Sequence, residues 1–120
     1  QLGYVKEAET MAKVYSAADL YCITSLADNF PTTVLESMAC GTPVVGFAVG
    51  GIPEQVTEDC GLLVAPDDTK GLGKAISDLL NDDLRREKMG TWCRRRAEQE
   101  YNLQRFVQRH LILYKRLLCQ

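Results

Sequence analysis

Short apolar runs alternate with stretches of helical periodicity along this chain, and this alternation predicts strands separated by helices. Asp19–Ser25 is rich in aromatic and β-branched residues and is too continuous for a half-exposed strand, Pro43–Phe47 is a second run of the buried type, and Gly61–Val64 is expected to form a third strand. Such runs are typical of strands buried on both faces of a parallel sheet. A fourth run, Leu2–Val5, is also expected to form a strand. The pattern predicts an α/β fold built in layers.

The spacing of apolar residues predicts helices over Lys6–Ala18 and Thr32–Cys40, with a single turn at 53–57. Gly41 follows the second helix, where a positive φ is needed. Three further helices are expected to begin at side chains that cap amides well, namely Asp68 or Thr69, Asp82 or Asp83, and Asn102. We expect the last two helices to pack across the sheet, with Trp92 and His110 in their apolar stripes.

Length and composition are those of one soluble domain, or of a piece of one. The 120 residues are 46% hydrophobic and 25% charged. No apolar run approaches the ~20 residues that span a bilayer. The five cysteines are odd in number and lack Cys-x-x-Cys spacing, which favours reduced thiols in a cytoplasmic protein over disulfides or a zinc site.

Charge is distributed unevenly along the chain. Residues 1–83 carry 4 basic and 13 acidic side chains, whereas residues 84–120 carry 10 basic and 3 acidic ones. The basic end could face the acidic first half, an anionic membrane surface or nucleic acid. It could equally be a solvated helical face. The triplet Arg94-Arg95-Arg96 could contact anionic lipid or serve only the solubility of its helix face.

The candidate binding residues follow the predicted strands Asp19–Ser25 and Pro43–Phe47. In parallel sheets, ligands bind beyond the carboxyl ends of the strands. Asp28 precedes a helix, and Glu36 is expected in the first turn of that helix. The free amides of such a turn can bind phosphate, and a nearby carboxylate can bind the paired hydroxyls of a ribose. Alternatively, Thr33-x-x-Glu36 is a capping box and Asp28 forms an Asx turn. Gly50-Gly51 either approaches a phosphate or only turns the chain.

The run SLADNFPTTVLESMACGTPVVGFAVGGIPEQV, residues 25–56, resembles the signature of the family 4 (group 1) glycosyltransferases. The shared pattern is an acidic residue, seven residues and Glu, followed by Gly-Thr-Pro-Val-Val and Gly-Gly-Ile-Pro-Glu. Residues 2–5, 61–66 and 102–118 resemble the flanking segments, so the resemblance covers essentially the whole chain. It implies a Rossmann-like parallel sheet from the C-terminal domain of a retaining enzyme of GT-B fold.

The resemblance also implies roles for individual residues. Glu36 matches the glutamate that holds the donor ribose. Asp28 stands where the family usually has a Glu that contacts the transferred hexose, and Asp is one methylene shorter. Pro31 lacks an N–H in a loop whose amides usually contact hexose and diphosphate. The implied donor-binding residues are Asp28, Asn29, Phe30, Pro31, Thr32, Thr33, Glu36, Gly50 and Gly51.

The same resemblance implies what this chain lacks. The family's Arg/Lys pair for the leaving diphosphate and its acceptor domain would precede residue 1, so we expect residues 1–120 to be a partial donor domain without catalytic residues. We expect no metal and no cofactor, and a UDP-, GDP- or ADP-sugar as donor. Missing strands would leave a sheet edge open to homodimerisation, or would alter the placement of residues 1–6.

Several functions remain open for the intact protein. The acceptor would be a glycan or a lipid-linked molecule in surface polysaccharide assembly, which places the protein in the cytoplasm, peripherally at the inner membrane face. The alternative is a non-catalytic interaction module that keeps the fold without the donor site. Nucleic-acid binding ranks last, because the chain offers no aromatic platform or reading helix.

Overall fold

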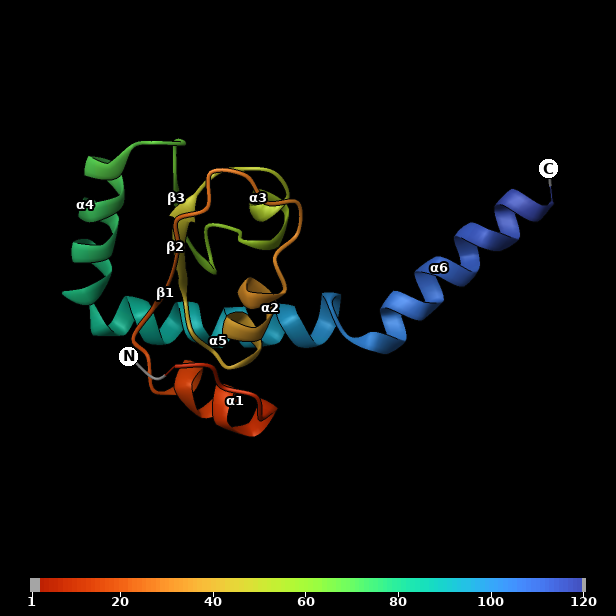
Figure 1. Ribbon diagram of the computed structural model, residues 1–120, viewed down its shortest axis with the longest axis horizontal. Coiled ribbons are helices and arrows are strands. Elements are labelled where there is room, and N and C mark those ends of the chain that lie inside the picture. The colour runs from red at the N-terminus through yellow and green to blue at the C-terminus, as the bar shows by residue number, and fades with distance from the viewer. Residues whose placement is uncertain (1–2, 120) are drawn as a thin grey trace.

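The computed structural model describes residues 3–119. Strands and helices alternate through the first two thirds of this range, and helices make up the rest (Figure 1). The elements are α1 (Ala8–Ser16), β1 (Tyr21–Ile23), α2 (Thr32–Ala39), β2 (Val44–Phe47), α3 (Ile52–Gln55), β3 (Gly61–Val64), α4 (Thr69–Leu80), α5 (Asp83–Glu100) and α6 (Leu103–Leu118).

The three strands form one parallel sheet in the order β1-β2-β3, as the buried apolar runs predict. In the register, Val45 lies opposite Cys22 on one side and Leu62 on the other. Helix α4 covers one face of the sheet, and α2 and α3 cover the other (Figure 1). All four residues of β2 are buried, because this strand has a neighbour on each side and helices on both faces.

The core lies between the sheet and these helices. Among residues 3–119, seven apolar side chains have no exposed surface: Val34, Met38, Val44, Val45, Ile52, Leu79 and Cys93. Burial of a Val, Leu, Ile or Met side chain stabilises the fold by roughly 1.5–3 kcal/mol. These residues come from α2, α3, α4, α5 and β2, so the core joins the sheet to the helices packed on both of its faces.

Helix ends follow the local chemistry of the sequence. Asp68 accepts a hydrogen bond from the Gly71 amide, Asp82 from the Arg85 amide and Asn102 from the Arg105 amide. Each side chain satisfies one of the amides that a helix leaves unpaired at its start. Gly41 has a φ of 78° just past α2, as its position predicts. The predicted caps are confirmed.

One predicted strand is absent. Gly3, Tyr4 and Val5 have no strand structure, and Leu2 lies outside the described residues. A parallel strand needs a neighbour to receive its amide and carbonyl bonds, and β1 is paired only with β2 in the part of the chain that the structure describes. Residues 3–6 instead run beside α1, where they line a hollow. The predicted strand over residues 2–5 is therefore wrong at its described positions 3–5, whereas homodimerisation stays a prediction.

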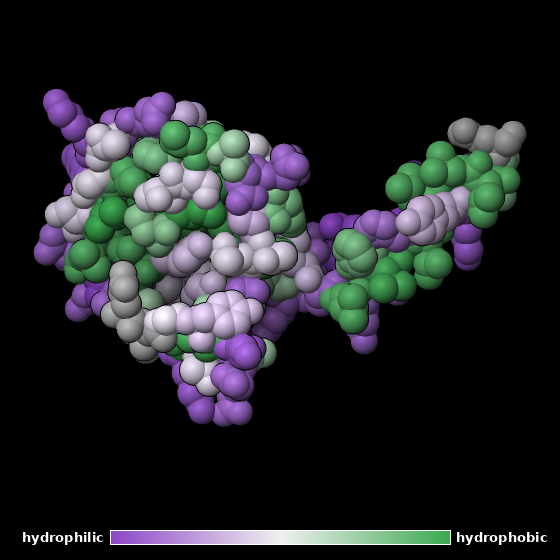
Figure 2. All heavy atoms as spheres, in the orientation of Figure 1, coloured by the Kyte–Doolittle hydropathy of each residue, from purple (hydrophilic) through white to green (hydrophobic). Residues whose placement is uncertain are grey.

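The expectation that α6 packs across the sheet is wrong. The helix turns away from α5 after Tyr101 and projects from the body of the protein (Figure 1). It has no buried residue, and His110, expected in the core, is only half-buried with Nδ1 2.9 Å from the Phe106 carbonyl oxygen. Figure 2 shows hydrophobic side chains gathered along this helix. Its exposed apolar residues are Leu103, Phe106, Val107, Leu111, Ile112, Leu113, Tyr114, Leu117 and Leu118.

Three apolar positions on α4 and α5 are also more exposed than their spacing predicts. Leu80 and Leu84 lie on the surface, and Trp92 is 40% exposed. The Arg95 guanidinium covers the Trp92 ring at 5.2 Å from its centroid. Periodicity identifies the apolar side of a helix, but it does not show how far the neighbouring layer extends.

Candidate functional site

The loop after β1 and the turn after β2 meet at backbone distance. The Gly51 amide donates to the Asp28 carbonyl oxygen over 3.3 Å. A Cβ atom at Gly50 would overlap that same oxygen, and one at Gly51 would overlap the carbonyl oxygen of Asn29. Gly50 also has a φ of 51°. Glycine is therefore required at both positions, and the two segments that the sequence singled out form one site.

The second half of the loop is held by α3 and by the end of α5. The Phe30 ring lies edge-on to Tyr101, with centroids 5.9 Å apart. Pro31 is buried, and its carbonyl oxygen accepts a hydrogen bond of 3.0 Å from Nε2 of Gln55. Each residue from Asp28 to Pro31 thus has its own contact, which gives this loop a defined shape.

The amino end of α2 is free of side-chain caps. Pro31 is the N-cap residue, and no side chain among residues 3–119 caps the helix. The capping box considered for Thr33 and Glu36 is absent: Thr33 accepts a hydrogen bond from the Tyr21 hydroxyl at 2.9 Å. Uncapped amides and the helix dipole favour an anion at this position.

Glu36 lies in the second turn of α2, one turn later than the sequence suggested. Its carboxylate is exposed and accepts a hydrogen bond of 3.2 Å from the hydroxyl of Tyr15, a buried residue of α1. Burial, and then the negative charge of Glu36, raise the pKa of Tyr15 to about 12. Tyr15 therefore stays a neutral donor that orients the carboxylate at ordinary pH.

A hollow of about 700 Å³ opens beside Glu36, between α1, α2 and the segment that precedes α1. Its volume is within the range of roughly 300–1,000 Å³ for small-molecule sites. Its lining residues are Gly3, Tyr4, Val5, Lys6, Ala8, Met11, Ala12, Tyr15, Glu36, Ala39 and Cys40. Glu36 thus borders this open space and shares its helix with the uncapped amides at the start of α2.

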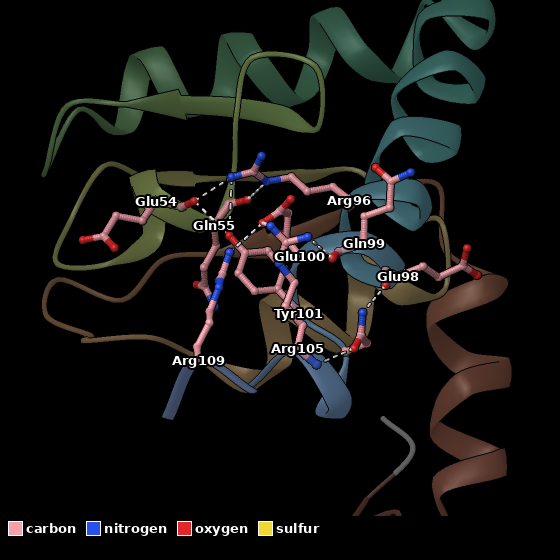
Figure 3. A network of polar contacts seen from close by, with 10 residues as sticks. Glu54, Gln55, Arg96, Glu98, Gln99, Glu100, Tyr101, Arg105 and Arg109 are labelled. Atoms are coloured by element: carbon pink, nitrogen blue, oxygen red, sulfur yellow. Dashed lines mark hydrogen bonds and ion pairs between the residues drawn. The ribbon is translucent and has the colours of Figure 1, made fainter. Parts of the chain in front are cut away.

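The sequence missed four side chains that shape this site: Tyr15, Gln55, Arg96 and Tyr101. Tyr15 stood among the apolar positions of its helix, and its hydroxyl gave no signal of a partner 21 positions away. The arginine triplet divides its contacts. Arg94 pairs with Glu98 and Arg95 covers Trp92, whereas Arg96 is half-buried and donates to the carbonyls of α3 (Figure 3).

The described residues contain no metal site, no disulfide and no membrane-spanning helix. Over residues 3–119, no group of three His, Cys, Asp or Glu side chains could hold a metal ion. All five cysteines are free thiols. No helix within the described range is long and apolar enough to cross a membrane.

The structure is thus an α/β domain with a parallel sheet, in which the loops after β1 and β2 meet beside the uncapped start of α2 and Glu36 borders a hollow. The family model "Glycosyl transferases group 1" matches residues 1–96, and the chain belongs to this family.

Similar proteins agree with this assignment. N-acetyl-alpha-D-glucosaminyl L-malate synthase of Bacillus anthracis is 30% identical over 112 residues, 92% of this chain and 29% of that protein. D-inositol 3-phosphate glycosyltransferase of Corynebacterium aurimucosum is 38% identical over 92 residues, 76% of this chain and 22% of that protein. The structure of sucrose-phosphate synthase from Thermosynechococcus elongatus matches with a TM-score of 0.84 and 36% identity, covering 92% of this chain and 28% of that one.

The fold is accordingly that of part of a GT-B glycosyltransferase. The chain spans between a fifth and a third of the length of these relatives.

Proposed function

We propose that this chain is the donor-binding part of a retaining glycosyltransferase that uses a nucleoside diphosphate sugar. The observation that carries the proposal is the exposed Glu36 carboxylate, oriented by Tyr15, at the edge of a hollow and on the helix whose first amides are uncapped. One element thereby offers partners for both a ribose and a diphosphate. Membership of the group 1 family supports the same assignment.

In this proposal the hollow between α1 and α2 takes the nucleoside of a UDP-, GDP- or ADP-sugar. The Glu36 carboxylate accepts hydrogen bonds from the ribose hydroxyls. The amides at the start of α2, from Thr32 and Thr33 onward, bind the diphosphate. The loop formed by Asp28, Asn29, Phe30 and Pro31 lies beyond that helix start with Gly50 and Gly51, and it contacts the sugar to be transferred.

The chemical contribution of this part is electrostatic. When the bond between sugar and diphosphate breaks, negative charge builds up on the departing phosphate, and preorganised amides stabilise this charge without having to reorient. Cations for the same phosphate, and the acceptor site, would come from the remainder of the longer enzyme. We assign no catalytic residue, metal or cofactor to residues 1–120.

The partner proposed for α6 is the rest of that enzyme, including its acceptor domain. Nine large apolar side chains are exposed on the described part of this helix. The match with sucrose-phosphate synthase includes 92% of this chain. It includes only 28% of the synthase chain. A neighbouring domain of the same protein would bury the face that is open here.

Acceptor and location belong to the same proposal. The acceptor is a glycan or a lipid-linked molecule of surface polysaccharide assembly, and the enzyme acts in the cytoplasm at the inner face of the membrane. In isolation the chain is expected to form homodimers through the open edge of β1, since an edge strand has unpaired amides and carbonyls.

Titration calorimetry with UDP, GDP and ADP tests the donor site. Glu36→Ala should weaken binding of the preferred nucleotide by about 1–3 kcal/mol, the range for a hydrogen bond to a charged group. Glu87→Ala, which removes an exposed carboxylate from α5 outside the lining of the hollow, is the control and should bind like the unchanged chain. Equal affinities for the two variants would remove Glu36 from the site.

The second candidate function is a non-catalytic interaction module. The open apolar face of α6 favours it, as does the short side chain of Asp28. It predicts that none of the three nucleotides binds at millimolar concentration.

A further inference from the structure

Gln55 is an unusual residue for a protein core. Its side chain is fully buried in α3, a helix of four residues. Nε2 donates to the Pro31 carbonyl oxygen over 3.0 Å, whereas Oε1 has no hydrogen-bond partner in the part of the chain that the structure describes. A buried polar atom without a partner destabilises a fold, and an apolar side chain of the same size would avoid that cost. Stability alone therefore does not explain a glutamine here.

The main chain of α3 is fixed from its other side by α5. Arg96 donates from Nε to the Gln55 carbonyl over 3.1 Å and from Nη2 to the Glu54 carbonyl over 3.0 Å. The Tyr101 hydroxyl donates to the same Glu54 carbonyl over 3.0 Å (Figure 3). These three bonds satisfy the last carbonyls of a short helix, and they keep the Gln55 side chain directed at Pro31.

A second route joins the same parts of the molecule. The Tyr101 ring contacts Phe30, and the Arg96 guanidinium lies 5.7 Å from the centroid of that ring. Hence both Phe30 and Pro31, the last loop residues before α2, depend on Arg96 and Tyr101. One route passes through a ring contact and the other through α3 and Gln55.

We propose that Gln55, held in place by Arg96 and Tyr101, is a positioning residue for the donor loop. Its bond to the Pro31 carbonyl sets where α2 begins, and so the direction of the amides that receive the diphosphate. The polar side chain is kept for this geometry and not for stability. This inference rests on the proposed donor function and adds to it residues from α3 and α5 that do not line the hollow beside Glu36.

The decisive variant is Gln55→Leu, which keeps the apolar bulk and removes both the bond to Pro31 and the unpartnered oxygen. Its midpoint of urea unfolding should equal or exceed that of the unchanged chain. Its affinity for the preferred nucleotide among UDP, GDP and ADP should fall at least fivefold. A merely structural role would give the opposite split, with lower stability and unchanged affinity, and that result would overturn the proposal.

Amide hydrogen exchange keeps the test separate from the donor function. In Gln55→Leu, the amides of residues 30 and 32–36 should exchange faster by at least fivefold where they are protected in the unchanged chain, with the core of β2 unchanged, whether or not any nucleotide binds. If no nucleotide binds the unchanged chain but exchange rises in this way, the donor function fails and the positioning role stands. Unchanged exchange at residues 30 and 32–36 contradicts the positioning role.

Tyr101→Phe supplies a second variant that is expected to fold in any case. It removes the hydroxyl, which donates to the Glu54 carbonyl and accepts from Nη2 of Arg96 over 3.4 Å, and it leaves the ring against Phe30 and Arg96. The same amides should exchange faster, by a smaller factor than in Gln55→Leu. Arg94→Gln is the control on α5, because Arg94 is exposed and pairs only with Glu98 among the described residues. Equal exchange in Tyr101→Phe and Arg94→Gln would contradict the role of Tyr101.

Discussion

The contact between Gly51 and Asn29 depends on the absence of a side chain at Gly51. A Cβ atom there would overlap the carbonyl oxygen of Asn29. Gly51 has a φ of −89°, which any residue can adopt, so only the neighbouring carbonyl excludes a side chain. At Gly73, in the interior of α4, an added Cβ atom would meet nothing within 4 Å. Substitution of Gly51 therefore tests a steric overlap, whereas substitution of Gly73 tests only the conformational preference of the backbone.

Gly51→Ala should lower the free energy of unfolding by about 2 kcal/mol or more, because a buried overlap forces the backbone to shift. Gly73→Ala should raise it by roughly 0.5–1 kcal/mol, since alanine is the better helix former. Urea unfolding of both variants checks the pair. Similar stabilities would mean that the two loops are not in contact in solution.

Tyr15 makes the stability of the protein depend on alkaline pH. Its pKa is raised to about 12 in the folded protein, against about 10 in an unfolded chain. Below pH 10 both states hold the proton and the full stabilisation is present. Between pH 10 and 12 only the unfolded state ionises, so stability falls as pH rises. This loss should be absent in Tyr15→Phe, as measured by urea unfolding at pH 9 and pH 11. Equal losses in both proteins would contradict the buried position of Tyr15.

At this scale the sequence predicts residues whose chemistry is local. Asn102 and Asp82 cap their helices as expected, and Gly41 adopts the positive φ that its position requires. The partners of Glu36 and Pro31 were not predictable, because Tyr15 and Gln55 lie 21 and 24 positions away along the chain. Residue types and spacing do not show which residues far apart in the sequence lie side by side in the fold.

Among the elements, the bounds of β2 and β3 are predicted best, whereas β1 covers only Tyr21–Ile23 of its run and exposes Cys22. β3 has the bounds of its apolar run, Gly61–Val64, and β2 differs from its run only at Pro43. The run 2–5 has similar composition, but Gly3–Val5 do not form a strand beside β1. A strand is completed by its neighbours, so composition alone cannot decide whether one forms.

Helix α6 demonstrates the same limit for helices, and it gives a prediction. A helix of 16 residues with no buried residue is only marginally stable in water. Leu111→Gln, on its exposed side, should change the free energy of unfolding by less than about 0.5 kcal/mol. Leu79→Ala, in the core, should lower it by about 2–5 kcal/mol. Tryptophan fluorescence during urea unfolding measures both, because Trp92 lies on α5.

A large loss in Leu111→Gln would show that α6 folds back onto the body of the protein in solution. That result would restore the packing expected from the sequence and would contradict the projecting helix.

At the scale of the whole molecule, a packed core stands beside surfaces that lack a neighbour among the described residues. The sheet and its covering helices form one core. Within the described residues β1 has a strand partner on one side only, and the apolar side chains of α6 are exposed (Figure 2). Both open surfaces are consistent with a chain that covers only 28% of its structural relative. The family and the fold could be predicted from residues 25–56, but the direction of α6 could not, because it depends on the turn at Tyr101 and Asn102.

The most direct test of the central claim is an amide chemical-shift titration of the labelled chain with UDP, GDP and ADP. The donor-site account predicts that one nucleotide shifts the signals of residues 3–6, 32–36 and 50–51 together, and that these shifts disappear in Glu36→Ala. Shifts confined to the arginines of α5 and α6, or identical shifts in Glu36→Ala, would contradict it.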